Sequence, residues 1–323
     1  MLWLALCLGA AALPVRALDT SREDVRSFAE EMRRKHGFDA AWLEGVLADA
    51  ASQPRIVELM SRPAESVLPW HRYRDHFLTE ERIDAGVAFW TEHRDEIAAV
   101  EKSTGVAAHI IVGILGAETF FGRITGKFRV VDALATLAFD YPPRARYFRS
   151  ELEEFLLLAR EQDFDTSALL GSYAGAMGSA QFMPRSYRAY AVDGDGDDRK
   201  DLWKSWCDVL ASIANYLAEH GWRDDQPVVA SASTWFPVIA GLAPGKLEPD
   251  STVKALRDGG LRFDTTLGEE APAFFVRVEG IAGPELKVGF HNLGVITRYN
   301  RSILYALVVD ELGRRVADRL PPA

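Results

Sequence analysis

Residues 109–123 read HIIVGILGAETFFGR, and this segment decides how the rest of the chain can be arranged. Ile111 and Leu115 stand one helical turn apart, which predicts a helix whose apolar stripe continues onto Glu118. Burial disfavours a charged carboxylate, so we expect the pKa of this acid to rise. A protonated acid near neutral pH is what glycosidic bond cleavage needs. The structural alternative is a glutamate near a helix end that pairs with Arg123 or a backbone amide.

A second segment, residues 171–187, reads GSYAGAMGSAQFMPRSY. Its glycines allow the backbone to approach a ligand closely, and Ser172 and Gln181 supply neutral hydrogen-bonding groups. The alternative is an ordinary turn between helices whose methionines and phenylalanine belong to the core.

The composition indicates a folded, acidic protein. The chain has 323 residues, of which 48% are hydrophobic and 26% charged, and a formal net charge of −10. This length suits about two domains with a sizeable core. Because binding to phosphate backbones relies on a basic face, nucleic acid is not an expected partner.

The pattern along the chain predicts an α+β fold that is mainly helical. Helical spacing recurs at Arg82 to Ala99, His109 to Phe120, Asp132 to Phe139, Ser150 to Arg160, Asp208 to His220 and Arg301 to Asp318. Between about residues 226 and 297 the pattern changes to short stretches rich in Val and Phe, which predicts a small β region.

Acids at alternate positions mark a candidate cation site. Asp193, Asp195 and Asp197 match the start of an EF-hand loop, whose oxygen ligands surround a hard cation. The later positions depart from that pattern, and the next acid that could close the loop is Asp208. We expect a structural calcium ion in preference to a solvated acidic turn, and no cofactor for catalysis.

The first residues suggest export. The apolar run from Leu2 to Leu13 is too short to span a bilayer, and small residues precede a cleavage point after Ala17. A buried or anchoring segment is the alternative, because the usual basic start is missing. Cys7 is poorly placed for lipidation, and with Cys207 as the other cysteine no disulfide framework is expected.

Together these segments resemble the membrane-bound lytic murein transglycosylase B family. The resemblance rests on GAETFFGR, DALATLAFDYPPRARYF, GSYAGAMGSAQFMPRSY and ITRYNRSILYA, in that order between about Tyr73 and Tyr305. It implies a lysozyme-like helical core with an additional helical region and a small β domain. We therefore predict these regions: 1–17 export signal, 18–100 N-terminal helical region, 101–225 catalytic core, 226–297 β domain and 298–323 C-terminal helix completing the cleft.

The resemblance also implies roles for individual residues. Glu118 would be the catalytic acid and base, and the EF-hand-like loop would bind calcium, with Arg199 contributing its carbonyl. The glycan would be contacted by Ser172, Gln181, Tyr299, Asn300, Tyr305, Tyr147, Arg144, Tyr73 and Tyr216. Without the resemblance, a tyrosine at helical spacing more often serves packing.

The expected reaction cleaves the β-1,4 bond between N-acetylmuramic acid and N-acetylglucosamine and leaves a 1,6-anhydromuramoyl end. One alternative is a lysozyme-type hydrolase, which needs a second acid, with Asp132 and Asp140 as the nearest in sequence. Another is a calcium-stabilised glycan-binding protein without catalysis. We expect a periplasmic monomer that binds peptidoglycan strands. Proteins that synthesise or remodel the cell wall are candidate partners.

Overall fold

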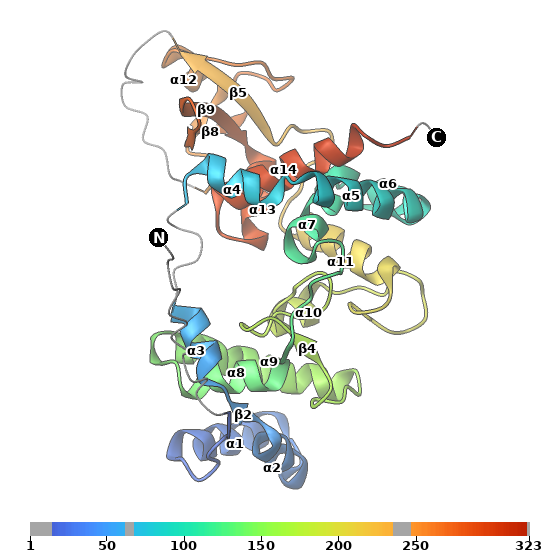
Figure 1. Ribbon diagram of the computed structural model, residues 1–323, viewed down its shortest axis with the longest axis vertical. Helices are drawn as coiled ribbons and strands as arrows, with labels where there is room; N and C mark the ends of the chain where they lie inside the picture. The colour runs from blue at the N-terminus through green and yellow to red at the C-terminus, as the bar shows by residue number, and fades with distance from the viewer. Residues whose placement is uncertain (1–14, 62–67, 235–246, 322–323) are drawn as a thin grey trace, which may run out of the picture. The chain divides into compact units, whose positions relative to one another are not determined.

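The computed structural model describes residues 15–61, 68–234 and 247–321 (Figure 1). The chain forms two compact units, one from residues 1–63, 126–177 and 182–188, the other from residues 64–125, 178–181 and 189–323. This division differs from the five consecutive regions predicted from the sequence. The chain passes between the units several times, so the segment predicted as one catalytic core, 101–225, contributes to both.

The first unit is built mainly from helices. In chain order its elements are β1 (Arg16–Ala17), α1 (Glu23–His36), α2 (Ala40–Asp49), β2 (Ala51–Ser52), α3 (Pro54–Ser61), β3 (Phe128–Arg129), α8 (Val130–Phe139), the 3-10 helix η1 (Pro142–Arg144), α9 (Ala145–Glu161), β4 (Leu170–Gly171) and α10 (Pro184–Tyr190). The short strands pair antiparallel, β1 with β2 and β3 with β4.

Two aspartates join the N-terminal segment to α8. Asp132 is buried in the first turn of α8, and its carboxylate accepts hydrogen bonds from the Ala51 amide (2.9 Å) and the Gln53 side chain (2.9 Å). Asp140, at the end of α8, accepts from Arg22 (2.5 Å) and the Ser52 hydroxyl (2.5 Å). The Asp132 side chain therefore satisfies a backbone donor and an amide donor of a segment that is distant in sequence.

The second unit combines a helical body with a small sheet. Its elements are α4 (Trp70–Phe77), α5 (Glu80–Glu92), α6 (Arg94–Thr104), α7 (Ala108–Thr119), α11 (Trp206–Glu219), β5 (Val229–Thr234), β6 (Ser251–Thr252), α12 (Val253–Asp258), β7 (Leu261–Arg262), β8 (Pro272–Gly280), β9 (Gly283–Phe290), α13 (His291–Tyr299) and α14 (Ile303–Ala317). The run predicted from Arg82 to Ala99 is two helices that meet at His93.

The sheet lies where the sequence predicts a β region. Its five strands are antiparallel, in the order β6-β8-β9-β5-β7. Residues of α12 and of the strands share one apolar cluster that includes Leu256, Phe275 and Phe290. The predicted α+β class with dominant helix is confirmed.

Helices α7 and α14 cross with almost no space between their backbones. A Cβ atom on Gly113 would lie 2.2 Å from the Val309 carbonyl oxygen, and one on Gly313 would lie 1.8 Å from the His109 carbonyl oxygen. The two contacts are four residues apart on each helix and run in opposite directions, so the helices are antiparallel. By the same register, the N-terminal turn of α14 faces the C-terminal turn of α7.

Most of the predicted export signal, residues 1–14, lies outside the described residues. After it, β1 pairs with β2 and Leu18 is buried. Within the described ranges, no single helix combines the length and apolar composition of a membrane span, and α6 with α7 meets these criteria only as a pair bent by 117°.

We expect Gly313→Ala to lower the free energy of unfolding by about 2–4 kcal/mol, because the added methyl group cannot fit against the His109 carbonyl without separating α7 from α14. Gly45→Ala in α2 is the control, since its methyl group would meet nothing within 4 Å and a helical alanine should gain about 0.5–1 kcal/mol. Urea unfolding followed by circular dichroism measures both. Equal stability of the two variants would contradict the close crossing.

Candidate active site

Glu118 stands in the last turn of α7, which is otherwise almost entirely buried. The residue itself is half-buried, so its carboxylate can meet both the core and a ligand. The helix ends immediately afterwards, where Phe120 and Phe121 both adopt left-handed backbone conformations (φ 51° and 57°). Such strained, non-glycine positions persist only where the surroundings hold them, and they concentrate at functional sites.

Two tyrosines lie close enough to Glu118 to sense its charge. Burial raises the pKa of Tyr305 well above its usual value, and the Glu118 charge raises it further. The Tyr305 hydroxyl is buried, and among the described residues no acceptor lies in a position that meets the criteria for a hydrogen bond to it. Its acidic neighbour is Glu118. Burial followed by the Glu118 charge also raises the pKa of Tyr299. Both phenols therefore stay protonated at any working pH and can act as hydrogen-bond donors.

The loop of residues 178–181 carries Gln181. The side-chain nitrogen of Gln181 donates to the carbonyls of Thr125 (3.0 Å) and Gly178 (2.9 Å). These bonds use both of its N–H groups, so its carbonyl oxygen is the group left to face a ligand. Gln181 also has a positive φ of 53°, a third strained position after Phe120 and Phe121.

Thr119 joins the end of α7 to this loop, and the sequence analysis did not single it out. Its fully buried hydroxyl donates to the Ser179 carbonyl at 3.1 Å and accepts from the Gly122 amide at 3.0 Å. From the other side, the Tyr299 hydroxyl donates to the Ala180 carbonyl at 2.6 Å. The sequence does not predict that Thr119 holds this loop, because a threonine after the glutamate resembles an ordinary residue at a helix end.

The remaining predicted tyrosines of this unit are core residues. Tyr216 donates its hydroxyl to the Arg298 carbonyl at 2.7 Å and stacks on His220 at 4.1 Å between ring centroids. Tyr73 in α4 is buried, and α4 is tied to α14 by an ion pair from the next residue, Arg74, to Glu311. Asn300 is half-buried at the end of α13.

Three predicted glycan-binding residues belong to the first unit. The Ser172 hydroxyl accepts hydrogen bonds from the amides of Ala174 (3.2 Å) and Ala176 (3.0 Å), which leaves its proton available to a ligand. Arg144 is exposed, with its guanidinium 4.6 Å from the centroid of the Tyr147 ring. Tyr147 is itself 39% exposed, so its ring can contact a sugar.

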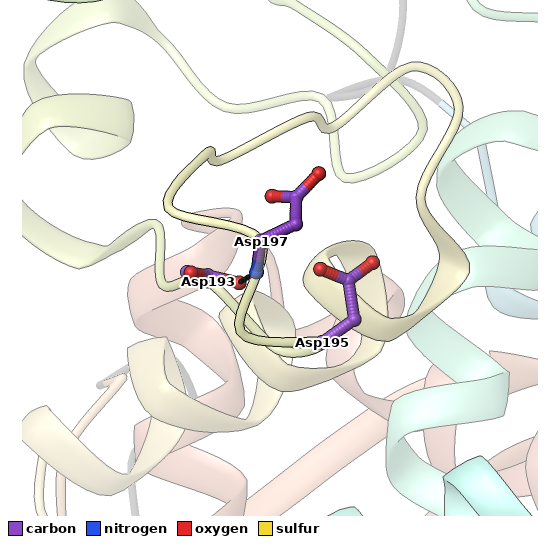
Figure 2. A group of neighbouring side chains, drawn as sticks. All are labelled: Asp193, Asp195 and Asp197. Atoms are coloured by element: carbon purple, nitrogen blue, oxygen red, sulfur yellow. Dashed lines mark hydrogen bonds between the residues drawn. The ribbon is translucent and has the colours of Figure 1, made fainter.

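The aspartate loop brings three carboxylates together, as Figure 2 shows for Asp193, Asp195 and Asp197. One oxygen from each lies within 4.8 Å of the others. Asp193 also organises the turn, because its oxygens accept from the amides of Gly196 (2.6 Å) and Asp198 (2.8 Å). A cluster of carboxylate oxygens alone fits a hard cation such as calcium.

Asp208 is placed differently from the other predicted ligands. It is 1% exposed, and its two oxygens accept from the amides of Gly194 (2.7 Å) and Asp201 (2.6 Å). It thus closes the base of the loop through the backbone. Arg199 donates its own amide to Asp197 at 2.9 Å, an arrangement that leaves its carbonyl free for the predicted contact.

Comparison with known proteins identifies the family. The model of the transglycosylase SLT domain matches residues 20–314. The chain belongs to this family. It is 41% identical over 303 residues to the membrane-bound lytic murein transglycosylase B of Escherichia coli (strain K12), a match that covers 91% of this chain and 82% of the relative.

Solved structures agree with this assignment. The catenated lytic transglycosylase SltB1 from Pseudomonas aeruginosa is 46% identical, with a TM-score of 0.88 over 92% of this chain and 98% of that one. The Escherichia coli lytic transglycosylase Slt35 in complex with calcium is 39% identical, with a TM-score of 0.84 over 94% and 95% of the two chains. The predicted family and lysozyme-like fold are confirmed.

We expect Thr119→Val to cause an about tenfold decrease in the rate at which the enzyme solubilises purified peptidoglycan, the predicted substrate. The change removes the hydroxyl that holds the Gln181 loop but keeps the volume of the side chain. Thr119→Ser retains the hydroxyl and should restore most of the activity. Circular dichroism checks that both variants fold. Full activity in Thr119→Val would show that the loop needs no such support.

Proposed function

We propose that the protein is a lytic transglycosylase that cleaves the β-1,4 bond between N-acetylmuramic acid and N-acetylglucosamine in peptidoglycan and leaves 1,6-anhydromuramoyl ends. The observation that carries the proposal is the single carboxylate of Glu118 at the strained end of a buried helix, beside neutral tyrosines. Its membership of the transglycosylase SLT family supports the same reaction.

In the first step, the Glu118 carboxylic acid gives its proton to the glycosidic oxygen, and the bond from that oxygen to the muramoyl anomeric carbon breaks. Positive charge develops on the muramoyl ring as the N-acetylglucosamine hydroxyl departs. In the second step, the C6 hydroxyl of the same muramoyl sugar attacks the anomeric carbon and loses its proton to Glu118. This tethered nucleophile has an effective concentration that can reach about 10⁵ M or more, so water need not be activated.

The structure disfavours the hydrolase alternative, which needs a second acid. Both acids nearest in sequence, Asp132 and Asp140, hold the N-terminal segment in place through hydrogen bonds to that segment. Freeing either one to activate water would remove the acceptor of two partly buried donors. Neither acid is a good general base.

We expect Glu118→Gln to lower the rate of peptidoglycan cleavage by at least about 100-fold, because glutamine cannot transfer a proton. Mass spectrometry of the soluble products measures both the rate and the chemistry, and the wild type should release anhydromuramoyl ends. Glu92→Gln, an exposed position at the end of α5, is the matched control. Reducing ends from the wild type would favour hydrolysis. Undiminished release by Glu118→Gln would favour a different acid, and glycan binding without any cleavage would favour a binding protein.

We also propose that Asp193, Asp195 and Asp197 hold a calcium ion that stabilises the loop before α11, with the Arg199 carbonyl as a further ligand. The like charges of three adjacent carboxylates repel one another unless a cation compensates them. Asp208 would support this site through the loop backbone. The calcium complex of Slt35 supports the choice of ion.

Millimolar calcium should raise the melting temperature of the chelator-treated protein by several degrees, because a ligand at about 100 times its dissociation constant stabilises the folded state by about 2.7 kcal/mol. Asp195→Asn should lose most of this shift, whereas Asp264→Asn removes an exposed acid elsewhere and should keep it. Differential scanning fluorimetry measures the shifts. An equal calcium response in the two variants would argue against the site.

We place the enzyme in the periplasm, exported through residues 1–17, where its substrate lies. Its Escherichia coli relative is a membrane-bound lytic murein transglycosylase, which supports a location at the cell wall. Peptidoglycan strands are the proposed partner, and the protein is proposed to act as a monomer.

A further inference from the structure

We infer that a cavity in the first unit, lined by α1 and α9, binds the peptides that substitute peptidoglycan strands. The inference rests on the proposed function and adds the class of strand that the enzyme prefers. The cavity, here called the α1–α9 cavity, has a volume of about 990 Å³ and is lined by eleven residues, among them Arg22, Glu23, Asp24, Glu31, Arg146 and Arg149. This volume suits a short peptide.

Several of the charges that line the α1–α9 cavity are already neutralised by one another. Asp24 accepts from Arg22 at 2.9 Å and from Arg149 at 3.2 Å. Glu153 pairs with Lys35 at 2.6 Å and with His36 at 2.8 Å. These pairs give the cavity its shape but offer little net charge to a ligand.

Three exposed charged side chains are left to meet a ligand. In the described part of the chain, neither Arg146 nor Glu23 nor Glu31 forms a hydrogen bond or ion pair through its side chain. A guanidinium binds a carboxylate through two parallel hydrogen bonds, and a carboxylate binds an ammonium group. The cavity therefore offers one guanidinium and two carboxylates, a mixed set of charges that a purely anionic ligand or a neutral sugar would not use.

A second cavity extends this site toward predicted substrate residues. It has a volume of about 500 Å³ and shares Ala145, Arg146 and Ser150 with the α1–α9 cavity. Arg144 and Tyr147, which the family resemblance assigns to glycan binding, line it as well. Arg146 thus stands on the wall between a predicted glycan contact and the mixed-charge cavity. Peptides of peptidoglycan branch from its glycan and carry both carboxylates and free amines, so they match this arrangement.

The test compares two substrates, peptide-bearing strands and the same strands freed of peptides by an N-acetylmuramoyl-alanine amidase. We expect Arg146→Ala to lower kcat/KM about fivefold on the peptide-bearing strands, the size of one partly exposed charge-assisted contact, and to leave the peptide-free strands unaffected. Arg26→Ala removes an exposed arginine of α1 that does not line the cavity, and should change neither value.

A second comparison tests the amine. Acetylation of the free amines of the peptides should slow the wild type by about as much as the double variant Glu23→Gln, Glu31→Gln slows cleavage of the unmodified strands, and acetylation together with the double variant should add nothing further. An equal loss on both substrates in Arg146→Ala, or no loss on either, would overturn peptide binding. The proposed function fails separately, if the wild type forms no anhydromuramoyl ends from either substrate.

Discussion

The close crossing of α7 and α14 is the constraint on which the proposed site depends. Gly113 and Gly313 allow each helix to rest on a backbone carbonyl of the other, so their relative position is fixed by hard contacts instead of by adaptable side chains. Asp310 strengthens the crossing, because it accepts from His109 at 3.4 Å and Arg314 at 3.0 Å. Burial opposes ionisation of Asp310, but these partners outweigh it and lower its pKa. The register then brings Tyr305 opposite Glu118.

Beside this crossing, hydrogen bonds to backbone carbonyls hold the site together. Thr119 and Tyr299 each donate to one carbonyl of the 178–181 loop. Gln181 donates to a loop carbonyl, that of Gly178, and to the Thr125 carbonyl. Backbone acceptors are displaced only when the backbone moves, so the Gln181 carbonyl is held in a narrow range of positions. That pre-organisation is useful to an enzyme that must align one acid with one bond.

The sequence was most informative where the information is local. The helix around Glu118, the turn chemistry at Asp193 and the change from helical to strand patterns near residue 226 all follow from spacing within a few residues. The role of Thr119 does not, because its partner Ser179 is sixty positions away. Asp208 is a second case in which local sequence does not reveal the partners. An acid near the loop suggests a cation ligand, but its oxygens accept hydrogen bonds from two backbone amides. The interleaving of the two units also depends on contacts that no local pattern encodes.

A buried, neutral tyrosine beside Glu118 suits the proposed reaction, in which one carboxylate acts first as an acid and then as a base. In general, burial favours the protonated form of a carboxylic acid, whereas a phenol that donates a hydrogen bond favours the carboxylate. Burial keeps Tyr305 protonated, and this phenol can stabilise the carboxylate once its proton has left without competing for that proton. The Tyr299 proton is already held by the Ala180 carbonyl, so Tyr299 acts on the loop instead. A second acid in the place of Tyr305 would repel the carboxylate, whereas a neutral donor adds no like charge beside a group that must give and then recover one proton.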